Sequence, residues 1–131
     1  MSQAATWAQV LAIALGASLG ALTRWQAGLR LGISMGWLPV GTLAVNAVGG
    51  LLIGLALAFF RLHPAAELAR LFCVVGFLGG LTTFSAFSGE SFRLLSDGRW
   101  TEAVVHTTLH VLGALLMAAA GHALGRWWWP G

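Results

Sequence analysis

Residues 76–90 read GFLGGLTTFSAFSGE and lie within an otherwise apolar segment of the chain. The adjacent Gly79 and Gly80, followed by Thr82 and Thr83, all weaken an α-helix. The segment therefore predicts a helix that is interrupted near its middle. Inside a membrane, unwound backbone is tolerated only where it is buried in protein or lines water. Its free carbonyls would be hard oxygen ligands, suited to a small hard cation.

The composition indicates that the chain does lie in a membrane. The 131 residues are 58% hydrophobic and only 8% charged, whereas a soluble domain carries about 25% charged residues. Four apolar stretches, at about 7–31, 37–60, 67–95 and 100–127, approach or exceed the roughly 20 residues that a membrane-spanning helix needs. We predict an all-α membrane protein with a single four-helix transmembrane domain over residues 1–131, whose third helix is broken at mid-membrane. The first short connector is a predicted turn at 33–36.

The arginines are divided almost evenly between the two ends of these predicted helices. One side holds Arg61, Arg70 and Arg126, and the other holds Arg30, Arg93 and Arg99, with Arg24 inside the first span but nearer this second side. Orientation follows the Lys/Arg bias of short loops, so an even count predicts insertion in both directions. Two oppositely inserted copies can pair about a two-fold axis in the membrane plane. We expect an antiparallel, dual-topology homodimer; the alternative is one orientation with a weak bias.

Small and polar residues recur about every four positions on two of the spans. They are Thr42, Asn46, Gly50 and Gly54 on the second span, and His106, His110, Ala114, Met117, Gly121 and Gly125 on the fourth. Small residues let helices approach closely in lipid, so these faces are predicted helix interfaces. Asn46 is the polar side chain nearest the middle of its span, where it is expected to face a cavity or a partner. The alternative is a hydrogen bond between helices that only holds the fold.

His106 and His110 project from one face of the fourth span because they are four residues apart. Imidazole binds zinc, but two histidines alone make a poor site, and the sequence places no Cys or carboxylate evidently beside them. We expect them to line a cavity or to pack near the membrane end. Glu90 and Glu102 are expected to be solvated near span ends. Arg24 either snorkels to the interface or places positive charge in an anion vestibule.

Phe84 and Phe87 follow the predicted break, three residues apart on similar helical faces. The edge of a phenylalanine ring carries partial positive charge. Ring edges, the hydroxyls of Ser85 and Ser88 and the Asn46 amide would form an uncharged path for a small anion that sheds its water and still leaves again. The alternative is that both rings are ordinary core or lipid-facing aromatics.

Three stretches together resemble the signature of the Fluc (CrcB-type) fluoride channels. They are GASLGALTRW at 16–25, GTLAVNAVG at 41–49 and the segment at 76–90, and their order and spacing match over nearly the whole chain. The resemblance implies a dual-topology homodimer with two antiparallel pores and a central structural sodium ion. It also implies a multi-pass protein of a prokaryotic plasma (inner) membrane, through which fluoride leaves the cell passively.

The resemblance also assigns roles to residues of this sequence. The implied sodium ligands are the backbone carbonyls of Gly79 and Thr82 from each copy. The implied anion pathway includes Phe84 and Phe87, with Asn46 orienting their rings and helping to coordinate the anion. A polar track is implied from Thr42 and Ser85 into the fourth span, and Arg24 matches an arginine near the channel mouth.

The fourth span departs from the family pattern. His106 and His110 stand where many members carry Tyr and Ser, Ala114 stands where they carry Ser, and Ala86 replaces a common Thr. The polar track of this chain is therefore expected to differ from that of its relatives.

Two other classes of function are weaker. No nucleophile–base pair or metal cluster is evident at a suitable depth, so we do not expect an enzyme. A small-multidrug-type dual-topology exporter of cations is the alternative, but proton coupling needs a carboxylate embedded in the membrane. The first span contains no carboxylate, and its charged residues are Arg24 and, close to its end, Arg30, which favours a passive anion path.

Overall fold

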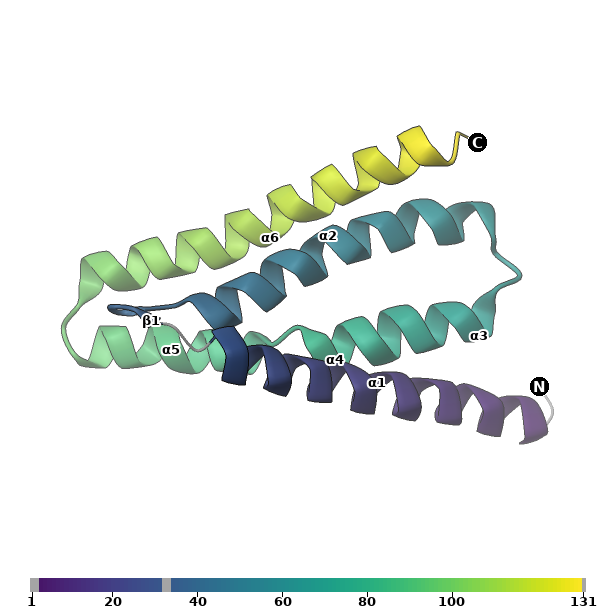
Figure 1. The fold of residues 1–131 in the computed structure, drawn as a ribbon, viewed down its shortest axis with the longest axis horizontal. Coiled ribbons are helices and arrows are strands. Elements are labelled where there is room, and N and C mark those ends of the chain that lie inside the picture. Colours follow the sequence, from purple (N-terminus) through teal and green to yellow (C-terminus); the bar gives the residue numbers. More distant parts are fainter. Residues whose placement is uncertain (1–2, 32–33, 131) are drawn as a thin grey trace.

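The computed structural model describes residues 3–31 and 34–130 of the chain. Four helical segments in these residues are long and apolar enough to cross a membrane: Gln3–Leu31, Val40–Leu62, Glu67–Ser96 and Trp100–Trp128. The prediction of an all-α protein with four apolar spans is therefore confirmed. The segments run lengthwise beside one another, and the two ends of the chain lie at the same end of the molecule (Figure 1).

The first two helices begin at other residues than the sequence predicted. Helix α1 (Gln3–Leu31) starts four residues earlier than expected. Helix α2 (Val40–Leu62) starts three residues later, because β1 (Ser34–Met35) pairs antiparallel with β2 (Leu38–Pro39). Gly36 makes this tight hairpin possible at φ +64°, a conformation that glycine adopts without strain. Residue 33, where the predicted turn begins, lies outside the described residues.

The third segment consists of four helical pieces. They are α3 (Glu67–Arg70), the π-helical η1 (Leu71–Leu78), α4 (Gly79–Leu81) and α5 (Phe84–Ser96). Gly79 and Gly80 remain helical, whereas Thr82 (φ −80°, ψ 153°) and Thr83 (φ −143°, ψ 111°) are extended. Threonine tolerates extended backbone well, and the Thr83 hydroxyl caps α5 by accepting a hydrogen bond from the Ala86 amide. The π-helical conformation of η1 was not predicted from the sequence.

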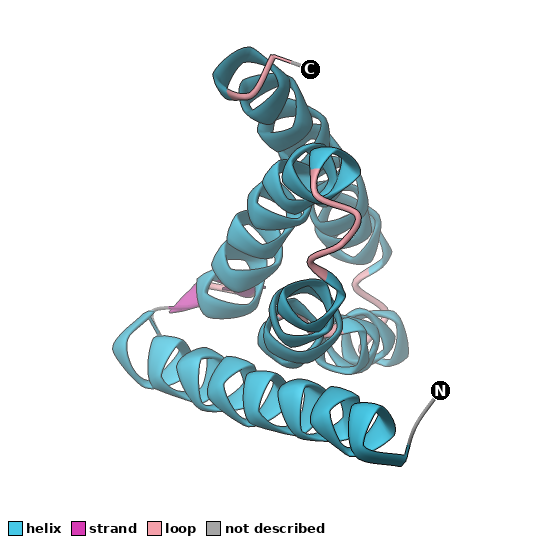
Figure 2. Ribbon diagram, turned by 90° about the vertical axis from the view of Figure 1, so that its right-hand side faces the viewer, coloured by secondary structure: helices cyan, strands magenta, loops and turns pink. Residues whose placement is uncertain are grey.

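Close backbone contacts hold the segments in pairs. Helix α2 packs along α6 (Trp100–Trp128), and α1 packs on η1 and α4, so α1 and α6 lie on opposite sides of the molecule (Figure 2). A Cβ atom built at Gly50 would lie 2.6 Å from the Ala114 carbonyl oxygen. Gly121 on α6 meets the α2 backbone at Leu51 in the same way. The small-residue faces predicted on the second and fourth spans therefore do approach another helix closely, and the structure shows that they meet each other.

Large apolar side chains point outward along the whole length of the molecule. Leu116 and Phe92 are each 70% exposed, and Trp7 is 66% exposed. A soluble monomer rarely exposes contiguous apolar surface on this scale. The outer surface therefore suits lipid or a second copy of the chain, whereas Thr83, His106 and His110 are polar residues buried inside.

Candidate functional site

Asn46 of α2 holds the interruption between α4 and α5. Its Oδ1 accepts a hydrogen bond from the Thr83 amide (2.9 Å), and its Nδ2 donates to the Thr83 carbonyl (3.3 Å). In a continuous α-helix the Thr83 amide would bond the Gly79 carbonyl, and the Ala86 amide would bond the Thr82 carbonyl. The Ala86 amide instead donates to the Thr83 hydroxyl (3.1 Å). The Thr83 and Ala86 amides, which would bond the Gly79 and Thr82 carbonyls in a continuous helix, thus donate to side chains instead. The Gly79 and Thr82 oxygens are therefore able to accept another ligand.

A groove of about 590 Å³ lies beside this interruption. Six of the eleven residues assigned from sequence to the anion pathway or the sodium site line it: Asn46, Gly79, Thr82, Phe84, Phe87 and His110. They come from α2, the third segment and α6, and only the packing of these elements brings them together. Thr42, Ser85, Ser88, His106 and Arg24 are not among the lining residues.

The two phenylalanine rings occupy different environments. Their centroids are 5.4 Å apart, but Phe84 is 78% exposed and Phe87 only 9%. Phe87 lies against both histidines of α6, with centroid distances of 5.6 Å to His106 and 5.2 Å to His110, and the two histidine rings are themselves 4.4 Å apart. Phe87 is therefore fixed by its neighbours, whereas Phe84 presents its ring at the open side of the groove.

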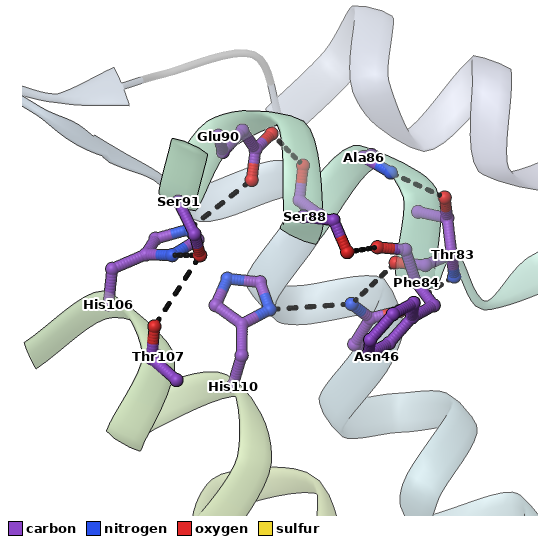
Figure 3. A network of polar contacts seen from close by, with 11 residues as sticks. Asn46, Thr83, Phe84, Ala86, Ser88, Glu90, Ser91, His106, Thr107 and His110 are labelled. Atoms are coloured by element: carbon purple, nitrogen blue, oxygen red, sulfur yellow. Dashed lines mark hydrogen bonds and ion pairs between the residues drawn. The ribbon is translucent and has the colours of Figure 1, made fainter. Parts of the chain in front are cut away.

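A polar cluster continues from the groove between α5 and α6 (Figure 3). The Thr42 hydroxyl donates to Glu90 Oε1 (2.8 Å), and Glu90 Oε2 lies 3.3 Å from His106 Nε2. His106 Nδ1 lies 3.0 Å from the Ser91 hydroxyl oxygen. His110 Nδ1 lies 3.4 Å from Asn46 Nδ2, which links the cluster back to the interruption.

The expectation for Glu90 was wrong. The sequence indicated a solvated carboxylate near a span end and no acidic group beside the histidines. The side chain of Glu90 is only 22% exposed, because α5 folds back on α6 and turns it toward His106. The signal was present in the spacing: Glu90 and Ser91 lie three and four residues after Phe87, and so share its helical face.

The remaining predicted residues lie around this centre. Arg24 Nε donates to the Gly80 carbonyl (3.2 Å), which places this guanidinium nitrogen at the backbone of the interrupted segment. The Ser85 and Thr83 hydroxyl oxygens are 3.2 Å apart. Ser88 donates to the Phe84 carbonyl (2.8 Å) within its own helix. The Ser88 hydroxyl therefore bonds within α5, whereas the side chains of the polar cluster bond between helices.

Four apolar helical segments around a groove with unwound backbone define a multi-pass membrane protein whose functional site lies among its helices. Residues 11–122 match the family described as CrcB-like protein, Camphor Resistance (CrcB). The chain belongs to this family, which confirms the family expected from the three sequence stretches.

Curated relatives match the chain over nearly its full length. A protein of Chromobacterium violaceum is 50% identical over 122 residues, covering 92% of this chain and 97% of the relative. One of Aromatoleum aromaticum is 45% identical over 129 residues, covering 98% of each. One of Pseudomonas aeruginosa is 48% identical over 124 residues, covering 92% and 96%. Each of these relatives is named fluoride-specific ion channel FluC.

Proposed function

We propose that the chain forms a fluoride-selective ion channel, not an enzyme, that lets fluoride leave the cell by passive electrogenic flow and so lowers its cytoplasmic concentration. The observation that carries this proposal is the match, over nearly the whole chain, to relatives named as fluoride-specific channels. The groove gives the proposal a physical basis. It joins ring edges, an amide and hydroxyls, and it holds no full charge that would trap a small anion.

The proposed pathway follows the groove and then the polar cluster. Its residues are Asn46, Phe84, Phe87 and His110 in the groove, and Thr42, Ser85, Ser88, His106 and Arg24 around it. An anion at Asn46 would replace the 3.4 Å contact with His110, which is the longest hydrogen bond of the amide. The two shorter bonds to Thr83 would stay and keep the backbone in place. Asn46 would thus position the interruption and the anion together.

The functional unit proposed here is an antiparallel homodimer embedded in lipid, in the inner membrane of a prokaryote. The even distribution of arginines supports insertion in both directions. The exposed Phe84 ring and the open groove beside it suit a surface that a second copy would cover. Each copy would then contribute its interruption to the centre of the dimer.

The carbonyls at the interruption fit a structural sodium ion. The amides that would bond the Gly79 and Thr82 carbonyls in a continuous helix donate to the Asn46 and Thr83 side chains instead. The two carbonyl oxygens are therefore available, and carbonyl oxygen suits hard cations. Two copies would supply four such uncharged oxygens, a set that suits a monovalent ion. When bound, sodium would supply the positive charge that holds the two interruptions together.

Fluoride efflux from liposomes that contain the purified protein tests the proposed function. The expected result is rapid electrogenic loss of fluoride with little loss of chloride, and none from protein-free liposomes. Equal chloride loss would contradict selectivity. Proton-coupled uptake of a lipophilic cation without fluoride loss would support a small-multidrug-type dual-topology exporter instead.

A further inference from the structure

Glu90, His106 and His110 form a cluster, and the proposed fluoride pathway gives its carboxylate no role. One carboxylate oxygen and one nitrogen from each ring all lie within 4.8 Å of one another. The carboxylate comes from α5 and both imidazoles from α6, so the cluster bridges two helices. We propose that these three side chains form a binding site for a divalent transition metal, with zinc as the ion that fits best.

The spacing of the ligand atoms suits tetrahedral zinc. Zinc bonds imidazole nitrogen and carboxylate oxygen at about 2.0–2.2 Å, which places neighbouring ligand atoms about 3.3–3.5 Å apart. His106 Nε2 and Glu90 Oε2 are already 3.3 Å apart. The third atom, on His110, lies within 4.8 Å of the other two, so it has to approach them by up to about 1.5 Å to complete the set. The fourth position of the tetrahedron remains open for water.

His110 provides a second, independent observation. Its side chain is buried at 4% exposure, and its Nε2 has no hydrogen-bond partner among the described residues. In Figure 3 this nitrogen points toward Glu90 and His106. Buried polar atoms are nearly always paired, so an atom left free and aimed at two other ligand groups indicates a missing partner. A metal ion would be that partner.

Neighbouring groups orient two of the ligands and constrain the third. Ser91 lies 3.0 Å from His106 Nδ1, and Thr42 lies 2.8 Å from Glu90 Oε1, as expected of the outer shell of a metal site. The Ser91 hydroxyl can donate or accept, so it accommodates the proton that His106 Nδ1 carries when Nε2 binds metal. His110 must likewise carry its proton on Nδ1. Zinc binding would therefore break the long contact from Asn46 Nδ2 (3.4 Å).

The ligand chemistry separates this site from the proposed sodium site. Two imidazoles and a carboxylate suit zinc and its neighbours in the first transition row, whereas Mg²⁺ and Ca²⁺ require oxygen ligands. The sodium proposal uses only backbone carbonyls, and those belong to Gly79 and Thr82. The zinc proposal does not depend on the proposed function, because its test measures bound metal and not ion flux.

The test is zinc binding to the full-length protein in detergent after removal of metals. Equilibrium dialysis against Zn²⁺ should give one ion per chain, and a hundred-fold excess of Mg²⁺ should not displace it. Glu90→Gln and His110→Ala should weaken binding by at least about 10–100-fold, the loss typical of even outer-shell changes. His63→Ala is the matched control, because this histidine lies at the end of α2 outside the cluster, and it should leave binding unchanged.

X-ray absorption at the zinc edge of the wild-type protein makes the test independent of how the variants fold. The expected shell has two imidazole nitrogens and a carboxylate oxygen, without sulfur. The proposal is overturned if the wild type retains no zinc, if the shell contains sulfur from Cys73, or if His63→Ala abolishes binding while Glu90→Gln and His110→Ala retain it.

Discussion

Replacing Asn46 with alanine is expected to destabilise the folded protein and to reduce fluoride flux. Asn46 makes two hydrogen bonds to the backbone of Thr83, one accepting from the amide and one donating to the carbonyl. Alanine can make neither. The Thr83 amide has no carbonyl to return to without rewinding α4 into α5, and this would move Phe84 and Phe87 out of the groove.

The magnitude follows from the burial of Thr83, which is only 7% exposed. A buried amide left without its acceptor destabilises by about 1–3 kcal/mol. The second bond, at 3.3 Å, is long and contributes about 0.5 kcal/mol. Water entering the groove in place of the Asn46 side chain would recover part of the loss, since water-mediated bonds are nearly as favourable as direct ones. We expect a net loss of about 2 kcal/mol in the free energy of unfolding.

Equilibrium unfolding in mixed micelles, followed by circular dichroism, measures this change. The matched control is Ser18→Ala, because Ser18 donates only to the Ala14 carbonyl on the exposed face of α1. Such a surface substitution should change stability by less than about 0.5 kcal/mol. If Asn46→Ala were no more destabilising than Ser18→Ala, Asn46 would not hold the interruption, and the role assigned to it would be wrong.

Three further outcomes are expected. Phe84→Ile and Phe87→Ile should each reduce fluoride efflux from liposomes while the proposed dimer stays intact on size-exclusion chromatography; undiminished efflux would remove these rings from the proposed pathway. Gly50→Ala should destabilise the α2–α6 pair by about 1–3 kcal/mol through overpacking, because its Cβ would lie 2.6 Å from the Ala114 carbonyl oxygen. Gly28→Ala, where a Cβ meets open space, should be neutral or stabilising by up to about 1 kcal/mol, and equal losses in the same titration would contradict the packing argument. Accessibility labelling of a cysteine added at the C-terminus should find both orientations in the membrane; a single orientation would rule out the antiparallel dimer.

Much of the fold was predictable because the bilayer leaves few choices. A chain with 8% charged residues and four long apolar stretches has to satisfy its backbone within helices. The small-residue faces of α2 and α6 were equally predictable, because a four-residue repeat places its members on one helical face, but the pairing of these two helices was not. The π-helical η1 was not predictable, because nothing in the composition of Leu71–Leu78 distinguishes it from an ordinary α-helical segment.

The exact position of the interruption could not be predicted from the helix preferences of the individual residues. The sequence placed a weak point among Gly79, Gly80, Thr82 and Thr83, but it could not say which residues would leave the helix. Both glycines stayed helical. Of the two extended residues, Thr83 is the one whose backbone amide and carbonyl Asn46 bonds from another helix, so a contact between distant parts of the chain fixes where the helix is interrupted.

The sequence by itself therefore determined the class of protein, the number of apolar spans, the family and six of the fifteen residues that line the groove. Each of these depends on composition, local spacing or short motifs. Only the tertiary structure decided that Glu90 turns inward to His106 and that His110 keeps a buried nitrogen unpaired. The physical reason is that helical spacing predicts which residues share a face, whereas the rotation and approach of α5 on α6 decide which face meets which.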